Sequence, residues 1–395
     1  MKTNNIFKKF LLAGGVALAF GLTSCEDFLT VLPTDQITED DFWKDKNDLD
    51  NVRSAAYQQM TKSDITGRIL YWGELRSDNF TQNDMSRSDI TYLQQGILQP
   101  TQGMFKWSNF YTGINYCNKV LEKGEQMTVP GSEVDPSFRQ SDWLPIKAEM
   151  QALRGLYYFY LVRAFRNVPY VTKSISTDAE AKESKIGATP GAVILADICD
   201  SLELAKTYGA EQYTSTSDTK GRFTKRSIHA LLADIYLWRA SVKHSAEDYQ
   251  KCIAYCDMVI ESKKANHVQG PMEIVAKEYP LEDGNMAYQS IFGIQNSEES
   301  IFELQNATGA INTYYYKYKN NNSTYGYLRA SSIFGSYAAS SLGTSPNTYL
   351  SMYDYRYWQN TYDVGSGASA FDVRKMTEAN GTTSLPTAGI KRSNS

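Results

Sequence analysis

The sequence from Ala152 to Phe165 reads Ala-Leu-Arg-Gly-Leu-Tyr-Tyr-Phe-Tyr-Leu-Val-Arg-Ala-Phe. On a helix, these apolar and aromatic side chains cover nearly every side, and a helix that is apolar all round is buried. The helical pattern begins at about Ser141, and Pro169 prevents its continuation. We therefore expect a buried helix over about 141–165 at the centre of a mainly α fold.

Amphipathic segments on both sides of this stretch predict further helices, because apolar residues recur three and four positions apart. Thr38, Thr189 and Ser245 are candidate N-caps. Small residues such as Ala230 and Ala233 let paired helices approach closely, as in tetratricopeptide repeats. The sequence therefore predicts tetratricopeptide-like helix pairs, with helices at about 42–60, 104–123, 141–165, 190–207, 224–243 and 246–263.

The predicted core follows from these faces. Leu156, Leu232 and Ile235 are expected to be almost wholly buried between helices. Cys252 and Cys256 stand four apart and share a helical face, which we interpret as buried, although a disulfide or a metal there stays an alternative. The whole predicted face of that last helix is Tyr249, Cys252, Ile253, Cys256 and Ile260.

The rest of the chain predicts long irregular loops and a few short strands. The stretch from Thr66 to Gly103 has no sustained helical period. Two short β-type runs begin at Ser290 and Ser300. Residues 306–367 are rich in Tyr, Asn, Ser and Gly, and their aromatic content favours ordered loops over disorder. Residues 381–395 are expected to form a disordered tail.

The N-terminus predicts export and lipidation. Lysines precede an uncharged apolar run from Phe10 to Leu22, which is too short to span a bilayer. The run ends in Leu-Thr-Ser-Cys25, a pattern typical of a bacterial lipobox. Residues 1–24 are therefore predicted to be a signal peptide, with Cys25 as the lipidated first residue. The alternative is ordinary secretion with Cys25 as a chance residue.

Composition favours binding over catalysis. The chain has 28 Tyr, 16 Phe and 6 Trp but only 3 His, which suits stacking and hydroxyl contacts better than acid–base chemistry. A net charge of −4 without a basic run makes nucleic acid an unfavourable partner.

Motif searches lead to the same conclusion. The Gly365–Ala370 glycine pattern lacks a flanking strand and helix, and is interpreted as a turn. Glu74 and Asp78 flank Arg76 and are interpreted as a salt-bridged turn, not a glycosidase pair. We therefore expect no catalytic residue, no metal and no cofactor.

Several local patterns together resemble the SusD/RagB family of outer-membrane lipoproteins. They occur in the expected order over roughly residues 20–305. They are Ser24–Leu29 with Pro33, Gly73–Asp78, Trp107–Leu121, Lys147–Pro169, Gly221–Leu237 and Glu299–Glu303.

This resemblance implies a helical, non-catalytic protein that binds glycans or other nutrients on an irregular, loop-built face. It implies a SusC-like TonB-dependent transporter as partner and attachment to the cell surface through the lipid anchor. Family chains usually continue into a further repeat helix and a Glu-Arg-x-x-Glu-Leu region. The resemblance therefore implies a SusD-like domain over 25–380 that is incomplete at its C-terminal end.

A sugar presents an apolar C–H face and a rim of hydroxyls, so its contacts should be exposed rings and amides in loops. Trp107, Tyr157 and Tyr236 are excluded as packing residues. The alternatives are a surface glycoside hydrolase, a protein-binding adaptor, and rings that merely pin loops to the helices. The predicted ligand-binding residues form two clusters, Tyr71, Trp72, Asn79, Phe80 and Tyr92 with Asn83 nearby, and Tyr325, Tyr327 and Trp358.

Overall fold

The computed structural model describes residues 42–73, 75, 80–82, 88–132, 134–266, 281, 291, 296–305 and 328–330. The chain divides into two units, 1–44 and 45–395, and the account below concerns the second. Its principal helices are α3 (Lys46–Met60), α4 (Ser63–Gly73), α5 (Ser88–Gln94), α6 (Ser108–Thr128), α7 (Gln140–Phe165), α8 (Asp178–Glu183), α9 (Gly191–Tyr208), α10 (Thr216–Gly221), α11 (Lys225–Lys243) and α12 (Ala246–Asn266).

The predicted central helix is present as α7, and its side chains are buried on several sides. Trp143, Tyr157 and Tyr158 are among the largest fully buried side chains. Two glycines of α6 make room for these rings, since a Cβ at Gly113 would lie 2.3 Å from the Tyr157 ring and one at Gly124 2.2 Å from the Trp143 ring. Close packing of α6 on α7 therefore depends on glycine at both positions.

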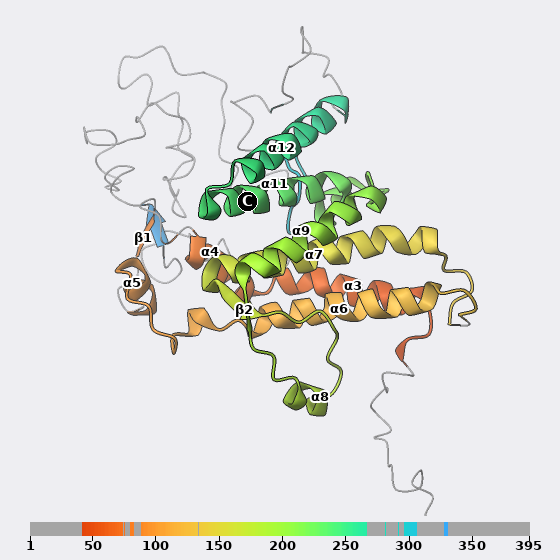
Figure 1. Cartoon of the computed structure of the whole chain (residues 1–395), viewed down its shortest axis with the longest axis horizontal. Coiled ribbons are helices and arrows are strands. Elements are labelled where there is room, and N and C mark those ends of the chain that lie inside the picture. The colour runs from red at the N-terminus through yellow and green to blue at the C-terminus, as the bar shows by residue number, and fades with distance from the viewer. Residues whose placement is uncertain are drawn as a thin grey trace, which may run out of the picture. The chain divides into compact units, whose positions relative to one another are not determined.

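The long helices form a stack. α3 packs on α6, α6 on α7, α7 on α9, α9 on α11, and α11 on α12 (Figure 1). In helical-repeat proteins, consecutive helices pack as hairpins, and each pair buries its apolar face against the next pair. The expected mainly α, tetratricopeptide-like architecture is confirmed.

Several element boundaries differ from the prediction. The stretch 66–103 is not wholly irregular, because it holds most of α4 and all of α5. α6 begins at Ser108, with Trp107 as its N-cap. α9 begins at Gly191, because Thr189 and Pro190 belong to strand β3. Ser245 does cap α12, since its Oγ accepts from the Asp248 N–H at 3.2 Å. The predicted cap Thr38 lies outside the described residues.

Two short antiparallel pairs are present among the described residues. β1 (Phe80–Gln82) pairs with β4 (Leu328–Ala330), and β2 (Asn167–Pro169) pairs with β3 (Ala188–Pro190). The run from Ser300, predicted as a strand, joins no sheet here; its Glu303 N–H donates to the Lys220 carbonyl at 2.8 Å. The run from Ser290 and the loops of 306–367 lie almost wholly outside the described residues.

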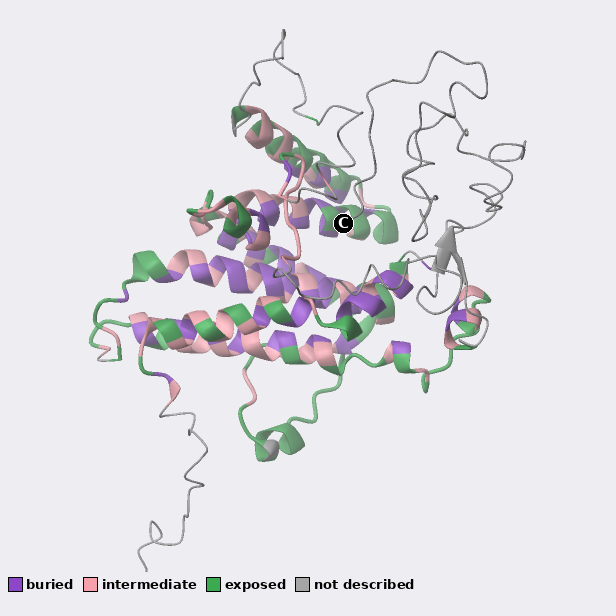
Figure 2. Ribbon diagram, turned by 180° about the vertical axis from the view of Figure 1, so that it is seen from behind, coloured by how far each residue is buried: buried purple, intermediate pink, exposed green. Residues whose placement is uncertain are grey.

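The core prediction holds for α11, fails for Leu156 of α7 and holds only in part for α12. Leu232 and Ile235 are fully buried, whereas Leu156 is only half-buried. On α12 the predicted inner residues Tyr249 and Ile253 are 40% and 52% exposed and Cys256 is exposed too, whereas Cys252 is buried as predicted. Figure 2 shows exposed residues along much of this helix.

The rotation of α12 has a polar and aromatic cause. Asp248 faces inward and pairs with Arg239 of α11 at 3.2 Å. Tyr255 stacks on Tyr236 with 5.9 Å between ring centroids. Because these contacts select the Asp248–Cys252–Tyr255 side, Tyr249, Ile253 and Cys256 of the predicted apolar face lie outward.

Candidate functional site

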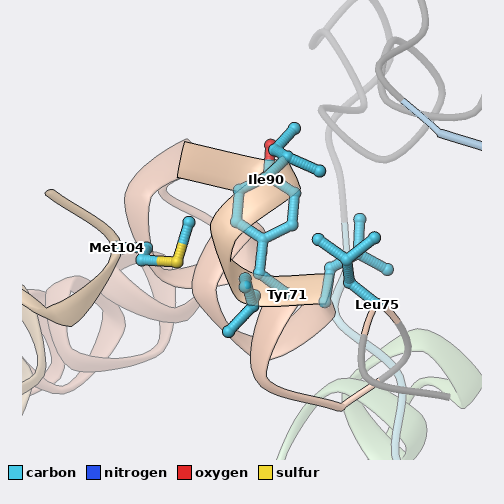
Figure 3. Close-up of a cluster of buried hydrophobic side chains, with 6 residues drawn as sticks. Tyr71, Leu75, Ile90 and Met104 are labelled. Carbon is cyan, nitrogen blue, oxygen red and sulfur yellow. The ribbon is translucent and has the colours of Figure 1, made fainter. Parts of the chain in front are cut away.

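The segment between α4 and α6 is built on a small hydrophobic cluster. Tyr71 of α4 points its ring at Ile90 of α5, and Leu75 and Met104 close the group (Figure 3). Tyr71 is only 6% exposed. A ligand-binding role for this ring would require it to leave the cluster, so in this structure Tyr71 supports the segment from within.

Trp72 fastens α4 to the helical stack. Its ring stacks on Phe110 of α6, with 5.2 Å between centroids, and meets Phe165 of α7 edge-on at 5.3 Å. Its Nε1–H donates to the Met104 carbonyl at 3.0 Å. These are the contacts expected of a ring that pins a segment to the helices, and they leave Trp72 half-buried.

Two aromatic side chains in this region do reach the surface. Tyr92 of α5 is 40% exposed, and Trp107 is 37% exposed. Trp107 packs edge-on against Phe165 at 5.0 Å and Tyr111 at 6.1 Å. Trp107 thus packs on these rings, as expected, and also presents part of its ring to solvent, because it precedes α6 instead of lying on the buried face. Tyr157 and Tyr236 are buried as predicted.

The strand pair β1–β4 brings the segment that carries Phe80 next to residues 328–330. Phe80 of the first cluster lies opposite Ala330, and Gln82 lies opposite Leu328, which follows Tyr327 directly. Segments far apart in the sequence thus meet at the α4–α5 region. Cys25, Asn79, Asn83, Tyr325, Tyr327 and Trp358 lie outside the described residues.

A ladder of α6 side chains holds the segment that follows α7. Asn115 exchanges two hydrogen bonds with Ile175, and Glu122 accepts from both the N–H and the hydroxyl of Ser174. Asn118 donates to the carbonyls of Val171 and Lys173 at 3.1 and 3.0 Å.

Asn118 is thus a satisfied buried amide, and it also accepts a hydrogen bond from Arg154 at 2.8 Å. At the start of the ladder, Tyr111 donates to the Pro169 carbonyl at 2.7 Å, and burial raises the pKa of this phenol. The ladder fixes the start of α6, with Trp107, against the end of α7, with Phe165.

The carboxylate buried most completely among the described residues is already paired. Glu149 of α7 accepts from Arg222 Nε at 3.0 Å and from the Tyr57 hydroxyl at 3.1 Å, and lies 3.7 Å from Arg53. Burial alone would lower the pKa of Arg222. The hydrogen bond and the charge of the Glu149 carboxylate outweigh burial, so the pKa is raised. The network ties α3, α7 and the C-terminal end of α10 together and is not arranged as a glycosidase pair. Within the described ranges, no cluster of three His, Cys, Asp or Glu side chains suits a metal ion.

The other residues singled out from the sequence are the two cysteines of α12 and the charged residues between Glu74 and Asp78. Cys252 is buried against α11, whereas Cys256 is exposed, and both are free thiols. Glu74, Arg76 and Asp78 lie outside the described residues. In the part of the chain that the structure describes, no helix is long and apolar enough to cross a membrane.

Comparison with known proteins supplies a family. A family model described as "Starch-binding associating with outer membrane" matches residues 27–237. SusD-like protein P38 of Formosa agariphila is 28% identical over 237 residues, which are 59% of this chain and 43% of that protein. SusD-like protein P2 of the same organism is 23% identical over 240 residues, 60% of this chain and 44% of that protein. The chain therefore spans less than half the length of these relatives.

Solved structures share the fold. A SusD superfamily protein from Parabacteroides distasonis superposes with a TM-score of 0.56 at 21% identity, covering 73% of this chain and 59% of that one. A SusD superfamily protein from Bacteroides vulgatus gives a TM-score of 0.55 at 20% identity, covering 74% of this chain and 58% of that one.

Proposed function

This chain belongs to the SusD-like family of carbohydrate-binding, outer-membrane-associated proteins, and on that premise we propose that it captures glycans or other nutrients at the cell surface. The family consists of binding proteins and not of enzymes. The single observation that carries the proposal is the family match over residues 27–237, which includes the helices from α3 to most of α11.

The proposed binding face lies at the α4–α5 region. Tyr92 and Trp107 would offer exposed ring faces to the C–H face of a sugar, while amides such as Asn79 would bond its hydroxyls. The β1–β4 pairing supports a contribution from the later segment, because Leu328, which directly follows Tyr327 in the sequence, lies opposite Gln82 of β1. The proposed ligand contacts are Trp107 together with Trp72, Asn79, Phe80, Tyr92, Tyr325, Tyr327 and Trp358, with Tyr71 supporting them from the core.

Delivery of the captured ligand completes the proposal. Lipidation of Cys25 would hold the protein on the outer membrane, where a SusC-like TonB-dependent transporter would receive the ligand. Several acyl chains anchor a protein stably, whereas a single chain binds only marginally. The family's association with the outer membrane supports this arrangement.

A protein-binding adaptor is the second candidate, and one observation favours it. Apolar side chains lie exposed on the last helix pair, where they form an outward surface suited to a protein partner. They include Leu237, Val242, Tyr249, Ile253 and Met258.

A glycan array on the purified protein beginning at Glu26 tests the proposal. We expect selective binding to one class of polysaccharide or oligosaccharide, with binding unaffected by chelators. A folded protein that retains no glycan, but captures the extracellular domain of another protein through α11 and α12, would contradict glycan capture and support the adaptor.

A further inference from the structure

Arg166, which directly follows α7, holds its backbone in a conformation that side chains rarely adopt. Its φ is 66° and its ψ is −62°. These angles are close to those of the classic γ-turn, which is rare and strained. His244 also has a positive φ, but its ψ of 41° places it in the ordinary left-handed region. Glycine would adopt the Arg166 conformation without a steric penalty, so the chain carries an arginine where glycine would be more stable.

The surrounding structure holds this strained turn in place on both sides. The Arg166 N–H donates to the Val162 carbonyl at 2.8 Å. Its carbonyl oxygen lies against the start of α9, where a Cβ at Gly191 would come within 2.2 Å of it. The next residue, Asn167, accepts a hydrogen bond from the Gly191 N–H at 3.3 Å. Strain that is fixed in this way at a non-glycine residue is characteristic of functional sites.

The strained turn lies beside the proposed binding face. The Phe165 ring, immediately before it, meets Trp107 edge-on with 5.0 Å between ring centroids. Just after it, the Pro169 carbonyl accepts a hydrogen bond from the Tyr111 hydroxyl at 2.7 Å. Both contacts are made with the start of α6, so Arg166 is held between them and close to the exposed ring of Trp107.

Two positively charged side chains stand beside this ring along the chain. Lys106 directly precedes Trp107, and Arg166 directly follows the phenylalanine that packs on it; both are exposed. In the part of the chain that the structure describes, neither side chain has a hydrogen bond, an ion pair or a ring contact. Arg163 differs from them, since its guanidinium lies 3.6 Å from the Asp234 carboxylate.

The carboxylate that α4 brings to the start of α6 is already occupied. Asp64 accepts a hydrogen bond from the Asn109 side chain at 2.7 Å and lies 3.6 Å from the Arg68 guanidinium. Lys106 and Arg166 are therefore available to an anionic group from outside the chain. A guanidinium offers paired N–H donors that match the oxygens of a carboxylate or a sulfate, and an ammonium group adds a point charge.

From this arrangement we infer that Arg166 and Lys106 recognise an anionic group on the sugar that covers Trp107, so that the captured glycan is acidic. The inference rests on the proposed function, because it assigns a substrate class to the binding face around Trp107. The shared chemistry of the ligand is a sugar that carries a carboxylate or a sulfate ester. Because the turn is fixed before the ligand arrives, its backbone loses little conformational freedom on binding.

Binding of paired acidic and neutral glycans to the purified protein tests the inference. One pair is oligogalacturonate and its methyl ester, and the other is a sulfated galactan oligosaccharide and its desulfated form. In calorimetry at low ionic strength, we expect one acidic member to bind at least about tenfold more tightly than its neutral partner. Its affinity should fall as salt is added. The pair that shows this difference distinguishes the carboxylate from the sulfate.

The failure of this inference and the failure of glycan capture give different results. Equal affinity for both members of each pair, or tightest binding to a neutral glycan on the array, would overturn the inference while leaving glycan capture intact. A folded protein that binds no glycan on the array would overturn both.

Substitution at Arg166 separates recognition from folding. Arg166→Gly should weaken binding of the acidic glycan about tenfold while raising Tm, because glycine removes both the guanidinium and the strain. Lys106→Gln should weaken the same binding several-fold. Lys182→Gln is the control, because it removes one exposed charge on α8, which projects away from the helical stack (Figure 1), and it should change neither readout. Full affinity for the acidic glycan in Arg166→Gly, or an equal loss in Lys182→Gln, would overturn the inference.

Discussion

Glu149 shows how a single residue can join three parts of the chain. Its carboxylate is fully buried on α7, yet it meets Arg53 and Tyr57 of α3 and Arg222 at the end of α10. A buried charge is tolerated when it is paired and hydrogen-bonded, and removing one partner leaves the others desolvated and unpaired.

We therefore predict that Glu149→Gln lowers the free energy of unfolding by about 3–5 kcal/mol, as measured by urea denaturation. Glu247→Gln is the matched control, because Glu247 pairs with Lys251 on the surface with its side chain 77% exposed. Such surface pairs contribute little to stability, so Glu247→Gln should unfold as the unaltered protein does. A loss of the same size in both variants would show that the Glu149 network does not join the helices.

The same scale shows where sequence reasoning about the site succeeds and fails. Asn118 is recognisable as a buried amide because it interrupts an apolar helical face. The exposure of Trp107 is not predicted, because the expected helix begins at about residue 104, whereas α6 begins at Ser108 and leaves Trp107 at its N-cap. Trp72 and Tyr71 are assigned to a loop because the short helix α4 has too few turns to show a clear period. Their packing is set by α5, α6 and α7, and no local pattern reports it.

At the scale of the element, the packing of α6 on α7 depends on two glycines facing two large rings. Gly124→Ala would set a methyl group against the buried Trp143 ring, which has no free space to move into. We predict a loss of about 1–3 kcal/mol in the free energy of unfolding, as is typical of overpacking.

Gly187→Ala is the control for this change, because a Cβ there meets nothing within 4 Å. Thermal melts of both variants should show a lower Tm for Gly124→Ala only. An unchanged Tm for Gly124→Ala would mean that α6 and α7 do not approach each other as closely as described.

Elements differ in how far their sequence predicts them. α7 is predictable because it is apolar on all sides, so no choice of face is needed. α12 is predictable as a helix, but its inner face is not. An Arg–Asp pair and stacked tyrosines outweigh the apolar stripe, and both involve residues of α11. Hydrophobic periodicity reports only the residues of one helix, and it cannot reveal their partners on a neighbouring helix.

At the scale of the whole molecule, the stack from α3 to α12 is a base on which the α4–α5 region is mounted. The ring contacts of Trp72 with Phe110 and Phe165, and its hydrogen bond to the Met104 carbonyl, fix that region to the helices. The general arrangement of helix pairs could be predicted from periodicity. The meeting of β1 with β4 could not, since three-residue strands far apart in the sequence carry no pairing signal.

The anchor is a prediction about the whole molecule in its cell. Cys25→Ala should abolish incorporation of a fatty-acid probe and move the protein from the membrane fraction to the soluble fraction, because the cysteine sulfur and the new amino terminus carry the lipid. Cys256→Ala, which removes an exposed thiol far along the chain, should leave both readouts unchanged. Membrane association that persists without probe incorporation in Cys25→Ala would rule out the lipid anchor.

The measurement that tests glycan capture most directly is titration calorimetry with the glycan identified on the array, comparing two tryptophan variants. Trp107 and Trp238 are each 37% exposed, but Trp107 lies in the proposed binding face and Trp238 lies on α11. We predict that Trp107→Ala weakens binding roughly tenfold or more, as expected for an aromatic anchor worth about 1.4 kcal/mol. Trp238→Ala should bind as the unaltered protein does. Full affinity in Trp107→Ala together with lost affinity in Trp238→Ala would contradict the account and place the ligand on the helical stack.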